Sequence, residues 1–333
     1  MIITRTPFRL SFFGGGTDYP VWYSHNEGLV IATTFSQYCY ITCRHLQPFF
    51  DYKSRVVYSK METVQEHTDI EHPAVRGCLE YLNVTSGLEV HHDADLPAKS
   101  GIGSSSTFTV GLLHALHGLK HEMPTKSQLA EEAIEVEHVL LHENVGIQDQ
   151  IMAAYGGLRL IEMGPSYGQK KYRVTPVILP PEYLANLEKY ILLGFTGLTR
   201  FASEIAEEQI QKLEKGEVNL GELFSITKEA LSLFQNNEDF EKIGRLLHQT
   251  WLIKKSLTHK VSNHLIDSLY ETGLRAGAIG GKLLGAGGGG FIMFFAPPEK
   301  HNRIKEALSK IRVWVPFKME TQGAQVIFHN EDY

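Results

Sequence analysis

The pattern of apolar and polar residues divides the first half of the chain into alternating strands and helices. Residues 3–13 alternate between apolar and polar side chains, and 30–44 are rich in β-forming residues. The predicted strands lie at 3–13, 30–44, 56–59, 88–92 and 158–163. Apolar residues at helical spacing predict helices at 73–83, 107–119 and 126–143, and a polar loop is expected at 164–173.

The second half carries longer helical patterns between short strands. The predicted helices lie at 201–214, 219–235, 240–250, 263–272 and 300–311. The predicted strands lie at 187–195, 291–295, 314–317 and 324–328. Strands and helices that alternate with antiparallel options predict the α+β class rather than a strictly parallel sheet. A length of 333 residues suits two domains, and we place them at 1–183 and 184–333, with the boundary near Pro180-Pro181.

Composition and charge exclude several classes of partner. Apolar residues make up 43% and charged residues 21% of the chain, which is typical of a globular protein. A net charge of −6 gives no basic patch for nucleic acid or an anionic membrane. No segment is long enough to span a bilayer, and the first residues lack the apolar stretch of a signal peptide. The three cysteines follow no zinc-site spacing, so we expect reduced thiols in a cytoplasmic protein.

Residues 96–106, which we call the serine loop, are the most informative segment. They read Leu-Pro-Ala-Lys-Ser-Gly-Ile-Gly-Ser-Ser-Ser and lead into the predicted helix at 107–119. Small residues let the backbone approach a ligand, and the N-terminus of a helix attracts phosphate. The alternatives are a flexible linker or an ordinary helix cap. The loop matches neither a Walker loop nor Gly-x-Gly-x-x-Gly.

Two further glycine-rich turns lie far from the serine loop in the sequence. We call residues 14–16 the first glycine turn and residues 285–290 the third glycine turn. Residues 101–103, within the serine loop, are the second. Each turn leaves a predicted strand or enters a predicted helix. Glycines also serve plain turns, but three such turns in one chain suggest a backbone that closes around one polyanionic ligand.

Glu137 interrupts an apolar helix stripe. With about 100° per residue from Leu129, Glu137 falls at about 80°, in the middle of the stripe. A carboxylate in that position is costly unless it is paired or binds a cation. Two interpretations remain open at this point: a buried ion pair with an arginine, or a Mg²⁺ site beside a phosphate chain.

Asp149 and Arg9 are the other charged residues of interest. Asp149 lies at the start of the helix that follows 145–148, where it is either a helix cap or a functional carboxylate. Arg9 shares the more polar side of the first strand with Arg5 and Ser11, so we expect its side chain to be exposed to solvent. Arg200 follows a strand end and could bind an anion, although a surface arginine fits the same pattern.

Three segments resemble the three motifs of the GHMP kinases, in the same order. They are residues 7–20, residues 96–106 and residues 282–291. Residues 146–150, Gly-Ile-Gln-Asp-Gln, are similar to the Gly-Ile-Met-Asp-Gln stretch that carries the catalytic aspartate of galactokinases. The resemblance covers nearly the whole chain. The Gly-Gly-Gly-Thr-Asp-Tyr-Pro form of the first motif looks most like bacterial heptose 7-phosphate kinases and fucokinase-like domains, whereas galactokinases carry Glu-His-x-Asp-Tyr.

The resemblance implies a fold and a reaction. The fold would be a two-domain α+β kinase, with an N-terminal ribosomal protein S5-like domain, a C-terminal ferredoxin-like domain and an active site in the cleft between them. The reaction would move the γ-phosphate of ATP, with Mg²⁺, to the anomeric hydroxyl of D-glycero-D-manno-heptose 7-phosphate. The product would feed nucleotide-activated heptose for surface polysaccharide. The alternatives are a kinase for an unphosphorylated sugar and a catalytically silent sensor. We expect a sugar phosphate as small-molecule partner, and a homodimer is one oligomeric option.

The resemblance also implies residue roles. Asp149 would accept the proton of the sugar hydroxyl, Arg9 would keep Asp149 ionised, and Ser105 would join Glu137 on Mg²⁺. The expected ATP-binding residues are Pro97, Lys99, Ser100, Gly101, Ile102, Gly103, Ser104, Ser105 and Ser106. The expected substrate-binding residues are Gly14, Gly15, Gly16, Thr17, Asp18, Gly197, Arg200, Gly287, Gly288 and Gly289.

Overall fold

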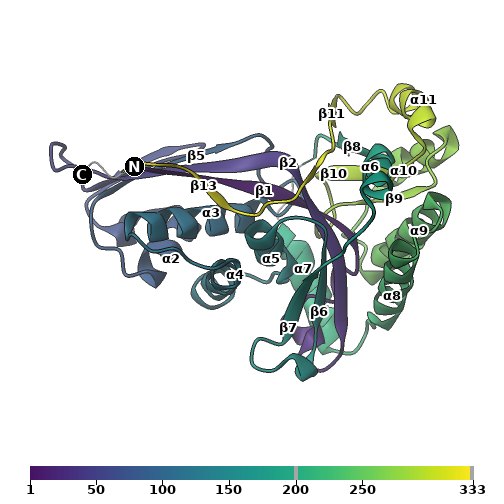
Figure 1. The fold of residues 1–333 in the computed structure, drawn as a ribbon, viewed down its shortest axis with the longest axis horizontal. Helices are drawn as coiled ribbons and strands as arrows, with labels where there is room; N and C mark the ends of the chain where they lie inside the picture. The colour runs from purple at the N-terminus through teal and green to yellow at the C-terminus, as the bar shows by residue number, and fades with distance from the viewer. Residues whose placement is uncertain (199–201, 331–333) are drawn as a thin grey trace.

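The computed structural model describes residues 1–198 and 202–330, which form two β-sheets with helices packed against them (Figure 1). The strands of the larger sheet are Ile2–Phe13 (β1), Gly28–His45 (β2), Ser54–Val57 (β3), Met61–Val64 (β4), Leu88–Ala94 (β5), Arg159–Met163 (β6), Tyr172–Pro176 (β7), Met319–Glu320 (β12) and Gln325–His329 (β13). The strands of the smaller sheet are Ile191–Phe195 (β8), Gly280–Leu283 (β9), Phe291–Phe295 (β10) and Val313–Val315 (β11).

The helices lie on the faces of these sheets and around their ends. They are Pro20–Tyr23 (α1), Pro73–Tyr81 (α2), Ser104–Leu119 (α3), Lys126–Glu135 (α4), Gln148–Tyr155 (α5), Pro181–Lys189 (α6), Ala202–Glu214 (α7), Gly221–Gln235 (α8), Phe240–Leu257 (α9), His264–Ala276 (α10) and His301–Ala307 (α11). A π-helical segment, Val136–Leu140, continues α4. Helices α2, α3, α4 and α5 lie on one side of the larger sheet in Figure 1.

Strands β1 and β2 form the centre of the larger sheet. They pair in antiparallel register, and β2 is long enough to pair also with β6 near its start and with β5 near its end. The β1–β2 register shifts between Pro7 and Phe8, where proline supplies no N–H to the ladder. A register shift of this kind changes where the following side chains point. Arg9 is the second residue after the shift.

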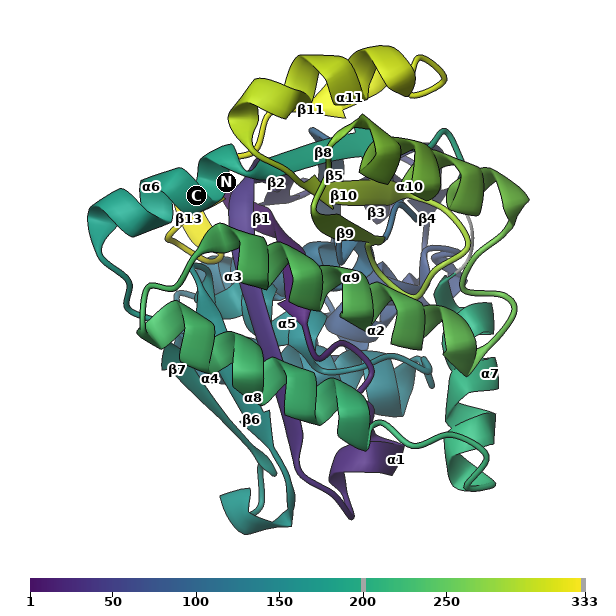
Figure 2. The same cartoon turned by 90° about the vertical axis from the view of Figure 1, so that its right-hand side faces the viewer.

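One hydrophobic core connects the two sheets. The largest buried cluster contains residues of β1 and β2 together with residues of α8, α9 and β10. Phe12 and Phe13 contact the ring of Phe234 edge-on, with ring centroids 6.2 and 6.4 Å apart. Figure 2 shows α8 and α9 side by side across β1, in agreement with their contacts. This packing holds the end of β1, and the first glycine turn after it, against the second half of the chain.

The last two strands return to the larger sheet. β12 pairs with β2 and β13 pairs with β1, so residues 319–329 add to the sheet that the first residues build. Close backbone packing joins this segment to the end of α5, where Ala324 N–H donates to the Ala153 carbonyl at 2.9 Å. The division of the chain at residues 183 and 184 stays a prediction. The strand predicted at 314–317 corresponds to β11 in the smaller sheet, whereas the strand predicted at 324–328 corresponds to β13 in the larger sheet.

The α+β class is confirmed, and most predicted elements are present, although several bounds differ and some short elements were not predicted. The strand predicted at 187–195 begins only at Ile191, because Pro181 starts a helix that runs through Leu187. The helix predicted at 126–143 changes to π geometry at Val136. The predicted loop at 164–173 ends in β7, and the short strand near residue 56 is one arm of the β3–β4 hairpin.

Two expectations from composition can be compared with the structure. All three cysteines, Cys39, Cys43 and Cys78, are buried and unpaired, as the reduced-thiol prediction requires. Within residues 1–198 and 202–330, no helix combines the length and apolarity needed to cross a membrane.

Gly323→Ala should weaken the docking of the C-terminal strands on the larger sheet. A Cβ at this position would overlap the carbonyl group of Ala154, and backbone cannot move aside as a flexible side chain can. We expect a loss of about 1–3 kcal/mol in unfolding free energy, measured by urea denaturation. The control is Lys318→Ala, which truncates an exposed side chain in the same segment and should change little. Equal midpoints for the two variants would contradict the described packing.

Candidate active site

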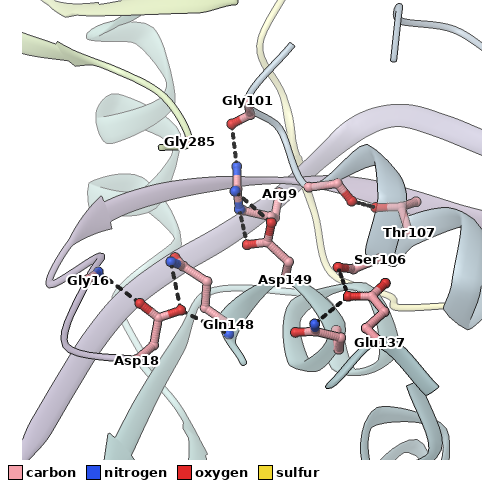
Figure 3. Close-up of polar contacts among 12 residues, drawn as sticks. Arg9, Gly16, Asp18, Gly101, Ser106, Thr107, Glu137, Gln148, Asp149 and Gly285 are labelled. Atoms are coloured by element: carbon pink, nitrogen blue, oxygen red, sulfur yellow. Dashed lines mark hydrogen bonds and ion pairs between the residues drawn. The ribbon is translucent and has the colours of Figure 1, made fainter. Parts of the chain in front are cut away.

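Arg9 and Asp149 form a bidentate ion pair at the centre of the site (Figure 3). Arg9 Nε donates to Asp149 Oδ1 at 2.7 Å, and Nη2 donates to Oδ2 at 2.8 Å. The prediction that Arg9 is exposed is wrong, since only 4% of the residue is accessible. The polar side of β1 is covered by α5, which carries Asp149, and by the serine loop. Strand alternation indicates the side on which a residue lies, but not what packs against that side.

Arg9 also holds the serine loop. Its backbone N–H donates to the Ile102 carbonyl at 3.2 Å, and its Nη1 donates to the Gly101 carbonyl at 2.6 Å. At Gly103 a Cβ would approach Asp149 Oδ2 to 3.1 Å, and the backbone of Gly103 adopts a left-handed conformation with φ 75°. Glycine is therefore needed where the loop passes the ion pair.

The serine loop places the N-terminus of α3 beside the ion pair of Arg9 and Asp149. Helix α3 begins at Ser104, and its N-cap residue, Gly103, has no side chain to accept from the first N–H groups. Ser105 is exposed, while Ser100 is buried and its hydroxyl donates to the Pro97 carbonyl at 2.6 Å. An uncapped helix start beside an arginine suits a phosphate group. The structure thus favours the anion-site interpretation over a linker.

The third glycine turn packs directly on the serine loop. A Cβ on Gly285 would lie 2.5 Å from the Cα of Gly101, and one on Gly290 would overlap the Ser100 carbonyl. Phe291 N–H donates to that same carbonyl at 3.0 Å. Two glycine turns separated by about half of the chain are thus in backbone contact. Figure 3 shows Gly285 beside the residues that Arg9 binds.

Some glycines of the third glycine turn were expected to bind substrate. In the structure they lie in contact with neighbouring loops. Gly288 N–H donates to the Val261 carbonyl at 2.9 Å, and Gly287 and Gly289 leave no room for a Cβ beside Val261 and Leu198. Gly197, another expected substrate residue, is exposed just after β8. Arg200 lies outside the residues that the structure describes.

Asp18 anchors the first glycine turn. Its carboxylate accepts from Gly16 N–H at 2.8 Å and from the Gln148 side chain at 3.1 Å. Gly146 is required nearby, because a Cβ there would overlap the Asp18 carboxylate. Burial raises the pKa of Asp18, and hydrogen bonds from the backbone N–H groups of Gly16 and Gln148 oppose the rise. Gln148 therefore links the first glycine turn to the residue before Asp149.

The structure does not support Thr17 as a residue whose side chain binds sugar. Its hydroxyl donates to the carbonyls of Gly14 at 2.8 Å and Leu29 at 3.1 Å, and accepts from Leu29 N–H at 3.1 Å. Thr17 is fully buried. Its side chain holds the turn together, and Asp18 remains the acidic residue of this motif at the site. The sequence pattern alone does not show that Thr17 and Asp18 have different roles.

Glu137 is completely buried, as its place on the apolar stripe predicted. Its Oε2 accepts from Ser106 Oγ at 2.8 Å and from Gln150 Nε2 at 2.5 Å, while its Oε1 has no hydrogen-bond partner. No ion pair to an arginine is present among the described residues, so that interpretation is wrong. Burial raises the pKa of Glu137 to about 8, with Glu143 as a second cause.

These residues fit a hard cation. A buried carboxylate with one unpartnered oxygen, beside a hydroxyl, offers the oxygen ligands that Mg²⁺ prefers, and Mg²⁺ usually takes only one or two protein groups plus phosphates. The serine that contacts Glu137 is Ser106, not Ser105 as expected. Glu137 lies in the π-helical segment, a geometry that often marks functional positions.

Four further residues of the site were not predicted. Gln148 and Gln150 flank Asp149 and bind Asp18 and Glu137 respectively, and their sequence signal was their place in the same motif. Lys254 and Lys282 are buried near the third glycine turn. Lys254 lies on the apolar stripe of α9 with Leu247 and Trp251, a signal of the same kind as that of Glu137, but the predicted helix ended at residue 250.

The chain resembles known kinases along its whole length. The model for the N-terminal domain of GHMP kinases matches residues 70–157, and the C-terminal model matches residues 228–312. A D-glycero-alpha-D-manno-heptose 7-phosphate kinase of Campylobacter jejuni is 29% identical, over 97% of this chain and 98% of its own length. A bifunctional fucokinase/GDP-fucose pyrophosphorylase of Arabidopsis thaliana is 24% identical over 91% of this chain, which spans only 31% of that protein.

Solved structures show the same fold. A D-glycero-D-manno-heptose 1-phosphate kinase from Bacteroides thetaiotaomicron superposes with a TM-score of 0.77 at 22% identity, over 99% of this chain and all of that one. Lactococcus lactis galactokinase complexed with galactose superposes with a TM-score of 0.74 at 18% identity, over 97% of this chain and 94% of that one. The two family models together cover just over half of the chain. The protein therefore belongs to the GHMP kinase family and is a phosphotransferase with a hydroxyl group as acceptor.

Proposed function

We propose that this protein is an ATP-dependent sugar kinase that phosphorylates the anomeric hydroxyl of D-glycero-D-manno-heptose 7-phosphate. The observation that carries the proposal is the position of Asp149 at the uncapped start of α3. A Cβ added to Gly103, the N-cap residue of this helix, would lie 3.1 Å from Asp149 Oδ2. A potential base and a potential phosphate site are thus neighbours. ATP as donor is supported by the family.

The serine loop would bind the terminal phosphates of ATP through backbone N–H groups at the start of α3. Asp149 would orient the sugar hydroxyl and accept its proton as the oxygen forms a bond to the γ-phosphorus and the bond to the β–γ bridging oxygen breaks. Arg9 would orient the carboxylate through its two hydrogen bonds and add positive charge beside the transferred group. Phosphoryl transfer depends mainly on such positioning and charge compensation.

Glu137 and Ser106 would hold Mg²⁺ next to the serine loop. The unpartnered Oε1 of Glu137 and the Ser106 hydroxyl would supply oxygen ligands, and Gln150 donates to Oε2, the same carboxylate oxygen that Ser106 contacts. When bound, the cation would neutralise charge on the phosphate chain. A carboxylate that is buried without a positive partner is otherwise hard to explain.

The acceptor is proposed from the similar proteins and from the first motif. The Campylobacter jejuni relative that aligns over nearly the whole chain is a heptose 7-phosphate kinase, and the plant relative is a fucokinase fusion. Asp18, with its two oxygens held by Gly16 and Gln148, would accept hydrogen bonds from sugar hydroxyls. The product, a 1,7-bisphosphate, would serve the synthesis of nucleotide-activated heptose for surface polysaccharide in the cytoplasm.

Asp149→Asn should abolish turnover while ATP still binds. The amide keeps the size of the carboxylate but cannot take the proton, so we expect kcat to fall by about 10²–10⁴-fold. Steady-state kinetics and calorimetric titration with ATP would measure the two effects. Asp69→Asn, at an exposed acid in the same domain, is the matched control. Near-normal turnover of the Asp149 variant would reject this residue as the base.

The metal-free protein should lose stability as pH rises. The folded-state pKa of Glu137, about 8, lies above its ordinary value of 4.5, so the stability that its protonated form contributes is complete below about pH 4.5 and is lost as pH rises towards 8. In EDTA, the unfolding free energy of the parent should fall by on the order of a few kcal/mol between about pH 4.5 and 8, and Glu137→Gln should remove this fall. Urea unfolding at each pH measures the free energy. The same variant should require more Mg²⁺ for activity. Parallel pH profiles for parent and variant would contradict the assignment.

The acceptor can be identified with a panel of sugars and sugar phosphates. Heptose 7-phosphate should give ADP release with a kcat/KM at least about 10²-fold above that of fucose, galactose or mannose, because a missing charged contact is costly. A preference for an unphosphorylated sugar would replace the acceptor in the proposal but not the kinase chemistry. Failure to release ADP with every sugar would favour a sensor.

A further inference from the structure

Two buried lysines near the site have no role in the proposed mechanism. Lys254, on α9, is 7% exposed, and Lys282, on β9, is 2% exposed. Each makes a single hydrogen bond, and both acceptors are backbone carbonyls: Lys254 donates to Gly285, and Lys282 donates to Phe12 at 3.2 Å. An ammonium group has three N–H donors. Among residues 1–198 and 202–330, no carboxylate forms an ion pair with either lysine.

Such a pair is costly in the absence of an anion. A buried charge needs a partner, and two like charges near each other add to the cost. Burial and then the charge of Lys254 lower the pKa of Lys282, and burial and then Arg9 lower the pKa of Lys254 to about 8. Asp18 opposes both pKa shifts and Asp149 opposes that of Lys254, but neither acid forms an ion pair with a lysine among the described residues. Asp149 is already bound to Arg9.

The lysines contact backbone at or next to the first and third glycine turns. Gly285, which accepts from Lys254, packs on Gly101, whose carbonyl accepts from Arg9. Phe12, which accepts from Lys282, lies two residues before the first glycine turn. Both cations therefore contact backbone that borders the proposed phosphate site. Their charge adds to that of Arg9 there.

We propose that Lys254 and Lys282 form an anion subsite that binds a phosphoryl group, with Lys254 as the contact and Lys282 as the positive charge behind it. The assignment of the ligand rests on the proposed kinase function. Lys254 is the more accessible of the two lysines. Its ammonium group donates to one carbonyl, that of Gly285, so its other N–H groups can bind a ligand. The phosphoryl group is either the terminal phosphate of ATP or the phosphate that the acceptor already carries. Both are tetrahedral dianions.

The competing explanation is structural. Lys254 could serve only to fasten the third glycine turn through Gly285. Lys254→Met separates the two explanations, because methionine fills the space of the buried stem and removes the charge. If Lys254 binds an anion, the unliganded variant should melt at the same or a higher temperature than the parent, since an unpaired buried charge has been removed. A purely structural lysine predicts a lower melting temperature.

The experiment compares Lys254→Met with Lys255→Met. Lys255 is the next residue of α9, is part-exposed and pairs with Asp267 on α10, so its variant controls for the loss of a lysine from the same helix. Calorimetry would measure dissociation constants for ATP and ADP, and steady-state kinetics would measure KM for heptose 7-phosphate and for the unphosphorylated heptose. A charge-assisted hydrogen bond to a phosphate corresponds to a loss of about 10–100-fold in affinity.

The proposal predicts a selective loss in Lys254→Met. A loss for ATP without a matching loss for ADP assigns the subsite to the γ-phosphate. A loss for the sugar phosphate without a loss for the free sugar assigns it to the acceptor. No loss for any ligand, or an equal loss for all four, would overturn the proposal. Lys282→Met provides a second test and should change the same ligand in the same direction, by a smaller factor.

Failure of this inference can be told apart from failure of the proposed acceptor. If the wild-type protein does not phosphorylate heptose 7-phosphate, the proposed acceptor is wrong. The comparison of ATP with ADP then still tests the subsite, because it needs no sugar. If the wild-type protein turns over the heptose phosphate and Lys254→Met binds every ligand as the parent does, the acceptor stands and the lysine subsite is wrong.

Discussion

The bidentate ion pair between Arg9 and Asp149 is the interaction on which the rest of the site depends. It joins β1 to α5, and the same guanidinium binds the Gly101 carbonyl of the serine loop. One side chain therefore fixes three segments that are remote in sequence. Arg9 is almost fully buried and Asp149 is part-exposed, so solvent weakens the pair less than it would weaken a pair on the surface. The start of α3 is positioned beside the carboxylate as a result.

The glycines around this ion pair are as important for the site as its charged side chains. Gly103 allows the loop to pass the Asp149 carboxylate, and Gly285 and Gly101 allow the third glycine turn to rest on the serine loop. A methyl group at any of these positions would push the segments apart. The glycine turns thus bring backbone N–H groups and cations, Arg9 and Lys254 among them, to one place. A polyanion with its metal ion is the ligand that such a place suits.

Sequence reasoning succeeded where the signal was local and failed where it depended on packing. Glu137 could be singled out because a charge on an apolar stripe is visible within one helix. Arg9 was placed on the correct strand face, but the burial of that face comes from α5 and the serine loop, which the strand pattern does not contain. The choice of Ser106 over Ser105 depends on the rotation of α3. Lys254 was missed because the predicted helix ended at residue 250, although the residue lies on the apolar stripe of α9. The fold class and family followed from ordered motifs, which report on the whole chain.

The most direct test is a crystal structure with an ATP analogue, Mg²⁺ and heptose 7-phosphate bound together. The account predicts phosphates at the start of α3, the metal ion between the phosphates and the Glu137 and Ser106 side chains, and the anomeric hydroxyl within hydrogen-bond reach of Asp149. Phosphates bound away from the serine loop, or a sugar hydroxyl that faces no carboxylate, would contradict it.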